Sequence, residues 1–183
     1  MPTHTDTLTF SLDGTVAIIT GAATGLGAST AQMLSQVGVK VLINHMPGQE
    51  LDAQSVAEGC INESLCYTAD ITKDDECKAM VQAVLQQWGR IDILINNAGI
   101  NKPVEHTDLE GLSAEDFINI YNVNVIGAYQ MIRAVAPAMQ QQSRGVVVNV
   151  SSGSGENGYG SSVAYAASKG AMNTMTKALG RAL

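Results

Sequence analysis

A glycine-rich turn between an apolar strand and a helix is the feature that most limits how this chain can fold. Residues 16–19, Val-Ala-Ile-Ile, are typical of a short buried strand, and residues 28–37 carry apolar side chains at helical spacing. Between them, residues 20–27 read Thr-Gly-Ala-Ala-Thr-Gly-Leu-Gly. Glycines let a backbone approach a ligand closely, and a helix N-terminus presents free N–H groups. We therefore predict an anion-binding turn; the alternative is a turn that serves only helix–strand packing.

Alternating strand and helix patterns with short connections continue along the whole chain. We expect strands near residues 15–20, 39–44, 64–69, 91–96 and 145–151, and helices near residues 25–37, 48–58, 73–88, 114–141 and 163–182. This alternation is typical of an α/β protein with a doubly wound parallel β-sheet, in three α/β/α layers. A length of 183 residues suits one such domain, spanning residues 1–183. Residues 153–162, rich in glycine and serine, are expected to form a loop that is either one wall of a pocket or only solvated.

The composition excludes several classes of partner. A net charge of −7 and a pI near 4.8 argue against nucleic acid and anionic membranes. The three cysteines and three histidines show no metal-ligand spacing, so no metal site is expected. Residues 1–9 are polar without an apolar signal core, and no stretch is long enough to span a membrane. We expect a cytoplasmic protein with reduced thiols.

A second motif lies near the end of the chain. Tyr165 and Lys169 stand four residues apart, which puts them on one face of a helix, and Ser152 precedes them by thirteen residues. A phenol has a reference pKa of about 10, and we expect the nearby ammonium to lower the pKa of Tyr165 toward the working range. Ser152 would then hold a substrate oxygen while Tyr165 exchanges a proton with it. The alternatives are a strand-end cap for Ser152 and a solvated helix charge for Lys169.

Five motifs together resemble the short-chain dehydrogenase/reductase family of nicotinamide-dependent enzymes on a Rossmann-like fold. They are the glycine turn at residues 20–27, the Asn-Asn-Ala-Gly run at residues 96–99, Asn124, Ser152, and the Tyr-x-x-x-Lys pattern at residues 165–169. They follow one another in the family's order over residues 10–183. Within the family, the chain is similar to 3-oxoacyl reductases and to sugar or polyol dehydrogenases.

The resemblance implies an NAD(P)-dependent oxidoreductase that interconverts a ketone and a secondary alcohol by hydride transfer. Its catalytic residues would be Ser152, which binds the substrate oxygen, Tyr165 as general acid/base, Lys169, and Asn124, which supports Lys169 through a water. Lys169 would also contact the nicotinamide ribose. The residues expected to bind the cofactor are Thr20, Gly21, Thr24, Gly25, Leu26, Gly27, Asn44, His45, Asp70, Ile71, Asn97, Ala98, Gly99, Tyr165 and Lys169.

The residues after the second strand bear on the choice between NAD and NADP. An acidic side chain there would bond the adenosine 2′-hydroxyl and favour NAD. The chain has Asn44, His45 and Met46 instead, with neither a carboxylate nor an arginine. Asn44 can bond a hydroxyl or a phosphate oxygen, and we favour NADP slightly. The resemblance assigns Asp70 to the adenine, while an N-cap role for Asp70 or Thr72 is the competing explanation.

The chain stops at Leu183, whereas members of the family continue through further strands and a substrate lid. We therefore expect a sheet without the usual last strands, whose fifth strand, with Val146, Val147 and Val148, forms an open hydrophobic edge. Either the chain is a fragment of a longer enzyme or a partner covers that edge. The alternative function is a non-catalytic dinucleotide-binding or interaction protein built on a truncated Rossmann core.

The resemblance also implies a homo-oligomer, a dimer or a homotetramer, formed through the two long helices of the second half. Apolar residues on these helices permit such an interface: Ile118, Val125 and Tyr129 on one, and Met172, Met175 and Leu179 on the other. The same positions would serve equally well as ordinary core.

Overall fold

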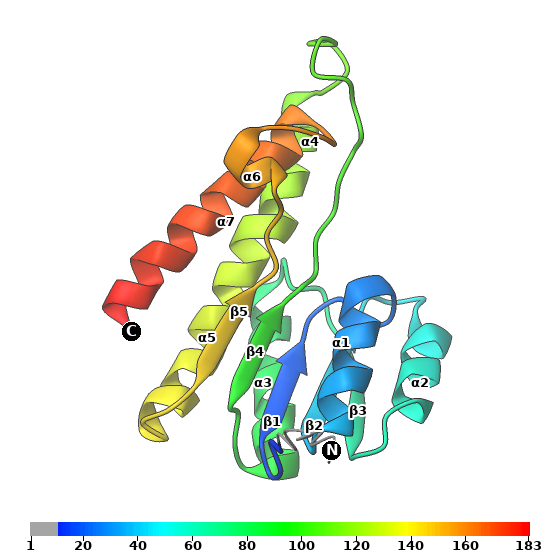
Figure 1. The fold of residues 1–183 in the computed structure, drawn as a ribbon, viewed down its shortest axis with the longest axis vertical. Helices are drawn as coiled ribbons and strands as arrows, with labels where there is room; N and C mark the ends of the chain where they lie inside the picture. Colours follow the sequence, from blue (N-terminus) through cyan, green and yellow to red (C-terminus); the bar gives the residue numbers. More distant parts are fainter. Residues whose placement is uncertain (1–10) are drawn as a thin grey trace, which may run out of the picture.

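The computed structural model describes residues 11–183, and its strands form one parallel sheet in the order β3-β2-β1-β4-β5 (Figure 1). The strands are β1 (Val16–Ile19), β2 (Lys40–His45), β3 (Ser64–Thr68), β4 (Ile93–Asn96) and β5 (Val146–Asn149). This order confirms the predicted doubly wound α/β fold. The prediction that residues 1–9 carry no signal segment concerns residues outside the described part of the chain.

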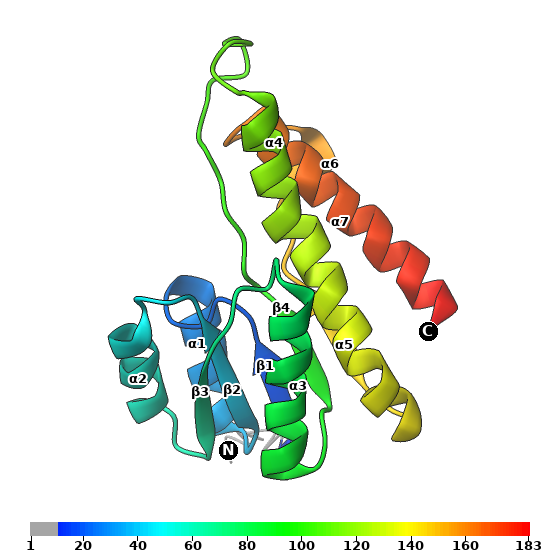
Figure 2. The ribbon, with the colours of Figure 1, turned by 180° about the vertical axis from the view of Figure 1, so that it is seen from behind.

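Helices connect the strands and lie on both faces of the sheet. They are α1 (Gly25–Gln36), α2 (Glu50–Glu58), α3 (Asp74–Trp88), α4 (Ala114–Tyr121), the π-helix η1 (Asn122–Gly127), α5 (Ala128–Gln141), α6 (Ser154–Asn157) and α7 (Val163–Ala182). Figures 1 and 2 show α1 and α2 on one face, and α3 and α5 on the other. Successive connections therefore bring the turns after β1, β2, β3 and β4 to one end of the sheet.

Two hydrophobic clusters, one on each face, fix the sheet between these layers. Because side chains alternate along a strand, Val16 and Ile18 belong to the cluster shared with α3 and α5, and Ala17 and Ile19 to the cluster shared with α1 and α2. All four are at most 1% exposed. Burial on both faces explains why β1 is an uninterrupted apolar run.

The helix predicted over residues 114–141 contains an irregular turn. Its start is fixed by a capping box, in which the Ser113 side chain accepts the N–H of Asp116 and the Asp116 side chain accepts the N–H of Ser113. Residues 122–127 then form the π-helix η1, after which α5 continues to Gln141. Such π turns are rare and occur often at functional sites. The segment predicted as a loop, residues 153–162, contains the one-turn helix α6.

The fifth strand lies at an edge of the sheet formed by the described residues, as predicted. Val147 is half-buried and packs on the α5 side, whereas Val146 is 56% and Val148 is 44% exposed. The layer of α1 and α2 does not extend over β5 (Figure 1).

The apolar positions named for an oligomer interface separate into two groups. Met172 is fully buried, and Met175 and Leu179 pack against the core, so the stripe on α7 serves the interior. Ile118 and Tyr129 are 58% and 44% exposed. Of these named positions, the ones on α4 and α5 keep apolar side chains available for a partner, and the homo-oligomer remains a prediction.

Candidate functional site

A cavity of about 430 Å³ opens at the carboxyl ends of β1, β2, β3 and β4. Eight of the residues predicted to bind a cofactor line it: Gly21, Thr24, Asn44, Asp70, Ile71, Asn97, Ala98 and Gly99. Seven others from the same prediction do not line it: Thr20, Gly25, Leu26, Gly27, His45, Tyr165 and Lys169. This is the position at which ligands bind in doubly wound sheets.

Only glycine fits at two positions of the turn after β1. Gly21 has a φ of +60°, and a Cβ added there would lie 2.9 Å from the Cα of Ala98. A Cβ added to Gly27 would lie 2.5 Å from the carbonyl oxygen of Gly21. The first glycine allows the turn to approach the end of β4, and the second allows α1 to pack against the turn.

Hydrogen bonds tie this turn to the residues that follow β4. The Thr20 hydroxyl accepts the N–H groups of Asn97 and Ala98, each at 3.0 Å. The Nδ2 of Asn97 donates to the carbonyl oxygens of Thr20 and Gly21, both at 3.0 Å. Thr20 and Asn97 are therefore positioning residues that keep two walls of the cavity together.

The start of α1 is open to a ligand. Thr24 precedes the helix but its side chain makes no cap hydrogen bond, and no acidic residue lies in the first turn. The N–H groups of a helix start, with the positive end of the helix dipole, bind phosphate. The tight glycine turn and this open N-terminus together fit the diphosphate of a dinucleotide. Leu26, 71% exposed, lies at the rim of this region.

The polar side chains at the end of β2 form hydrogen bonds with other groups of the protein. The Oδ1 of Asn44 accepts the N–H of Gly21 at 3.2 Å, and its Nδ2 donates to the carbonyl oxygen of Ala69 at 3.0 Å. The imidazole of His45 is 3% exposed, with Nε2 3.3 Å from the Thr68 hydroxyl. Asn44 thus joins the ends of three strands while it also lines the cavity, and its bond to a ribose hydroxyl or a phosphate stays a prediction.

Asp70 lines the cavity but does not cap a helix. Its Oδ1 accepts both the N–H and the hydroxyl of Thr72, at 2.9 and 2.7 Å. The helix α3 begins later, at Asp74, with Lys73 at its N-cap position. The competing N-cap explanation is therefore wrong for Asp70 and for Thr72, because both belong to the turn before the helix.

Lys169 is buried beside Tyr165. Its Nζ lies 5.6 Å from the centroid of the Tyr165 ring and donates to the carbonyl oxygen of Val150 at 2.8 Å. The residue is 3% exposed, and burial lowers the pKa of its ammonium group. The alternative of a solvated helix charge is wrong for Lys169.

Asn124 lies in the π-helix and is fully buried. Its Oδ1 accepts the N–H of Ile100 at 2.8 Å, and its Nδ2 donates to the carbonyl oxygen of Ile100 and to the Ser168 hydroxyl, both at 3.0 Å. The Ser168 hydroxyl in turn donates to the carbonyl oxygen of Tyr165 at 2.7 Å. A Cβ added to Gly99 would lie 3.3 Å from the Asn124 Oδ1 and 3.5 Å from the Lys169 Nζ, so both groups flank this glycine.

Ser152 follows β5 and makes local hydrogen bonds. Its hydroxyl accepts the N–H of Ser154 at 3.2 Å and donates to the Ser154 hydroxyl at 3.2 Å. These local bonds just after β5 are compatible with the alternative of a strand-end cap, and a contact of Ser152 with a substrate stays a prediction. Tyr165 lies in the first turn of α7, whose N-cap Ser162 accepts the N–H of Tyr165 at 3.3 Å.

Several residues of the site were not predicted from the sequence. Ser168 stands inside the Tyr-x-x-x-Lys pattern, and the buried amide of Asn124, which needs polar partners, was the signal that could have indicated it. Met46 was noted only as a neighbour of Asn44, and Gln49 and Ile100 had no motif to mark them, although all three line the cavity.

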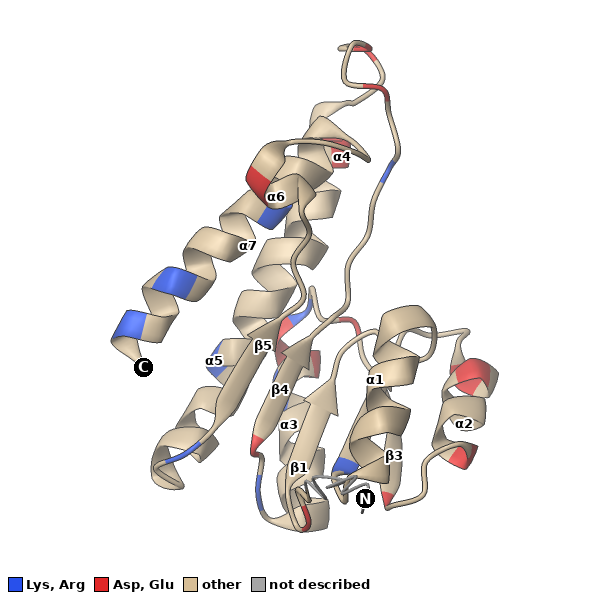
Figure 3. Ribbon diagram, in the orientation of Figure 1, with Lys and Arg blue, Asp and Glu red and all other residues tan. Residues whose placement is uncertain are grey.

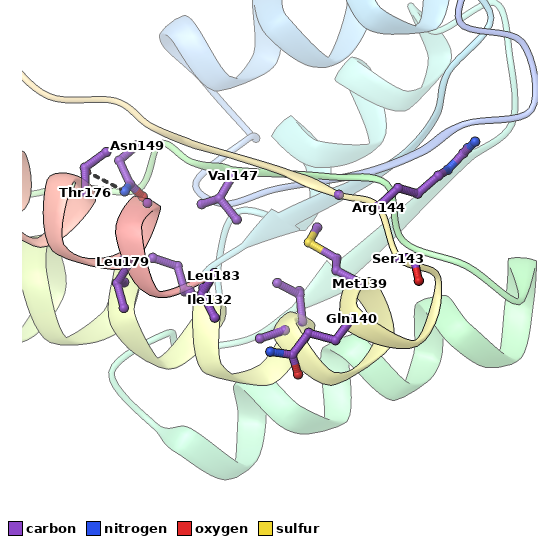
Figure 4. A pocket seen from close by; sticks show the side chains of 14 residues that line it. Ile132, Met139, Gln140, Ser143, Arg144, Val147, Asn149, Thr176, Leu179 and Leu183 are labelled. Carbon is purple, nitrogen blue, oxygen red and sulfur yellow. Dashed lines mark hydrogen bonds between the residues drawn. The ribbon is translucent and has the colours of Figure 1, made fainter.

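A larger cavity of about 610 Å³ lies between β5, α5 and α7 (Figure 4). Its walls include Met139, Val147 and Leu179, and the Asn149 Nδ2 donates to the Thr176 hydroxyl across it at 2.8 Å. None of the residues predicted for catalysis or cofactor binding lines it. Size alone does not make it the site, because it lacks the glycine turn, the helix N-terminus and the Tyr165–Lys169 pair.

Residues 11–183 offer neither a metal cluster nor a membrane span. In this range, no three side chains capable of ligating a metal ion lie together. No helix among the same residues is long and apolar enough to cross a bilayer.

Known proteins are similar to this chain along most of its length. A sequence model of the short chain dehydrogenase family matches residues 15–183. The chain is 38% identical to the 3-oxoacyl-(acyl-carrier-protein) reductase FabG of Thermotoga maritima, covering 91% of this chain and 67% of that protein. It is 35% identical to the 3-hydroxyacyl-CoA dehydrogenase type-2 of Rattus norvegicus, covering 94% of this chain and 69% of the relative.

Solved structures with this fold are also similar in sequence. A short-chain dehydrogenase/reductase from Burkholderia xenovorans superposes with a TM-score of 0.88 at 41% identity, over 91% of this chain and 71% of the other. An NAD⁺-bound xylitol dehydrogenase superposes with a TM-score of 0.84 at 31% identity, over 91% of this chain and 64% of the other. The chain spans about two thirds of the length of the proteins it matches. On these matches and on its fold, the chain belongs to the short-chain dehydrogenase family.

Proposed function

We propose that the protein is an NAD(P)-dependent oxidoreductase that interconverts a ketone and a secondary alcohol. The observation that carries the proposal is a buried lysine whose Nζ lies 5.6 Å from the centroid of the Tyr165 ring, in a fold with a close glycine turn before an uncapped helix N-terminus. The relatives support it, because they are named 3-oxoacyl reductase, 3-hydroxyacyl-CoA dehydrogenase and xylitol dehydrogenase. Each name refers to an oxygen-bearing carbon that is oxidised or reduced.

The cofactor would occupy the cavity at the carboxyl ends of the strands. The turn around Gly21 and the N-terminus of α1 would hold its diphosphate, and Asp70 and Ile71 would border its adenine. Asn97, Ala98 and Gly99 would line the path toward Tyr165 and Lys169. A bound nicotinamide cofactor supplies the hydride in reduction and accepts it in oxidation.

The side chains of the protein would handle the substrate oxygen and its proton. In reduction, negative charge grows on that oxygen, and the hydroxyl groups of Ser152 and Tyr165 donate hydrogen bonds to it. Tyr165 then gives its proton to the oxygen. The ammonium of Lys169 stabilises the phenolate that remains, because a positive charge near the ring favours the anion. Oxidation of an alcohol is the same path in reverse.

Asn124 and Ser168 would act as positioning residues. The Asn124 amide binds both backbone groups of Ile100, beside Gly99, and it also contacts Ser168. Ser168 holds the carbonyl oxygen of Tyr165, so the helix that carries the proton donor is tied to the wall of the cavity. This arrangement limits the movement of Tyr165 relative to a bound cofactor.

The test is Tyr165→Phe, with Tyr159→Phe as the matched control. Tyr159 is 82% exposed in the loop before α7, and it loses the same hydroxyl. With 3-oxoacyl thioesters, ketoses and polyols as substrates, we expect Tyr165→Phe to lower turnover by at least about 100-fold, the usual effect of losing a general acid. Cofactor binding and the turnover of the control should be unchanged. Full turnover by Tyr165→Phe would refute the mechanism, and cofactor binding without turnover by the unmodified protein would favour the non-catalytic alternative.

A further inference from the structure

We infer that the cavity binds NAD more tightly than NADP, because the surface beside the adenosine ribose is neutral to acidic. Met46 is the residue whose side chain determines this preference. This inference rests on the proposed function and names its cofactor. It reverses the slight preference for NADP that the sequence indicated.

The ribose next to the adenine is recognised, in folds of this kind, at the end of the second strand, about 20 residues after the glycine turn. In this chain the two polar side chains at that place are occupied within the protein. Asn44 bonds Gly21 and Ala69, and His45 is buried against Thr68.

The residues just after β2 that remain at the cavity surface are neutral. Met46 is 45% exposed and lines the cavity together with Gln49. The Oε1 of Gln49 accepts the N–H of Met46 at 3.1 Å, which holds the two side chains in one turn. A thioether and an amide can border a ribose hydroxyl, but neither carries the positive charge that binds a phosphate.

The charges near this turn are negative. Asp70 is the one ionisable residue among those that line the cavity. Glu50 follows Gln49, and its Oε1 accepts the N–H of Gly48 at 3.0 Å. Hydrogen bonds from the backbone N–H groups of Gly48 and of Glu50 itself lower the pKa of Glu50, so it is an anion at neutral pH. Figure 3 shows acidic residues and no basic ones on α2.

The lysines near the adenosine end, among the described residues, are paired with carboxylates. Neither α1 nor α2 contains a lysine or arginine. The basic residue nearest in sequence to Asp70 is Lys73, and its Nζ lies 2.9 Å from the Glu76 carboxylate. The other oxygen of that carboxylate accepts the N–H of Asp70 at 2.7 Å. Lys73 is therefore neutralised by an ion pair at the start of α3.

These charges act on the two cofactors differently. NAD presents a neutral 2′-hydroxyl at this place, whereas NADP presents a phosphate that would meet two carboxylates and no free cation. The repulsion passes through solvent, so salt screens it. NAD and NADP are otherwise identical. The ratio of their affinities for the protein therefore reports on the 2′-position alone.

The experiment is a fluorescence titration of the full chain with NADH and with NADPH at low salt. We expect NADH to bind at least about 10-fold more tightly, and the ratio to narrow when the salt concentration is raised to about 0.5 M. Met46→Arg adds a cation beside the ribose, and we expect it to tighten NADPH binding about 10-fold while changing NADH binding little. Met33→Arg is the matched control, because Met33 is 66% exposed on α1 and does not line the cavity.

The outcomes separate this inference from the function on which it rests. NADPH binding as tightly as NADH, or more tightly, would overturn the inference and leave the proposed function standing. An equal gain in NADPH affinity from Met33→Arg and Met46→Arg would remove Met46 as the deciding residue. Binding of neither cofactor by the folded chain would overturn the proposed function, and the inference with it.

Discussion

Replacing Gly21 by alanine tests whether the close approach of the turn to the end of β4 shapes the cavity. Gly21 has a φ of +60°, and the new methyl group would lie 2.9 Å from the Ala98 Cα and 3.1 Å from its Cβ. Gly25 supplies a control in the same turn. Its φ is +58°, and a Cβ added there meets nothing within 4 Å. The two substitutions share the backbone strain, and only the first adds a steric clash.

The expected magnitudes follow from this difference. An alanine held in the left-handed region costs about 1–2 kcal/mol. Overpacking by one methyl group costs about 1–3 kcal/mol, and the clash here is with backbone, which cannot rotate away. We therefore expect Gly21→Ala to lower the free energy of unfolding by about 2–4 kcal/mol, and Gly25→Ala by about 1 kcal/mol, since a less flexible unfolded chain offsets part of the strain.

Urea unfolding followed by circular dichroism, without cofactor, measures both values. With a slope of about 2 kcal/mol per molar urea, the midpoint of Gly21→Ala should fall by about 1–2 M and that of Gly25→Ala by about 0.5 M. Equal losses for the two variants would show that the contact with Ala98 does not constrain the turn, and the argument from close approach would fail.

Two further predictions concern ionisable groups. Burial alone would raise the pKa of Asp92, but hydrogen bonds from Arg90, Arg144 and the N–H of Val16 outweigh it and lower the pKa. The resulting stability is present above about pH 4 and is lost as the pH falls through the lowered value. Asp92→Asn should therefore cost about 2 kcal/mol at pH 6, discounted for the exposed arginines, and flatten the loss of stability below about pH 4. An unchanged pH profile in that variant would contradict this. Burial, with the nearby acidic residues, raises the pKa of Cys77 to about 12. A thiol reagent at pH 8 should therefore label Cys77 in urea but not in the native protein. Mass spectrometry locates the label, and equal labelling rates in the two states would contradict the prediction.

Local chemistry explains why much of the fold and of the site could be predicted from the sequence. The turn at residues 20–27 needs glycine for reasons of backbone geometry that hold in any fold, and strands buried on both faces must be apolar throughout. The positions of Tyr165 and Lys169 on one face of α7 follow from helical spacing alone. These features do not depend on distant parts of the chain.

The features that the sequence did not indicate depend on tertiary contacts. The bonds that Asn44 makes to Gly21 and Ala69, which come from other connections of the sheet, could not be inferred from its neighbours along the chain. Asn124 in the π turn bonds Ile100, which lies 24 residues earlier in the sequence. Pattern and propensity describe neighbours along the chain, so they cannot supply either arrangement.

The edge strand β5 has a consequence for the handling of a protein that consists of residues 1–183 alone. Its exposed valines and unpaired backbone can bind the same edge of another copy, and at neutral pH the net charge of −7 opposes such encounters. The electrostatic repulsion between copies disappears near the pI of about 4.8, while the exposed apolar edge of β5 remains. Precipitation of folded protein should therefore set the acid limit of its working range before unfolding does.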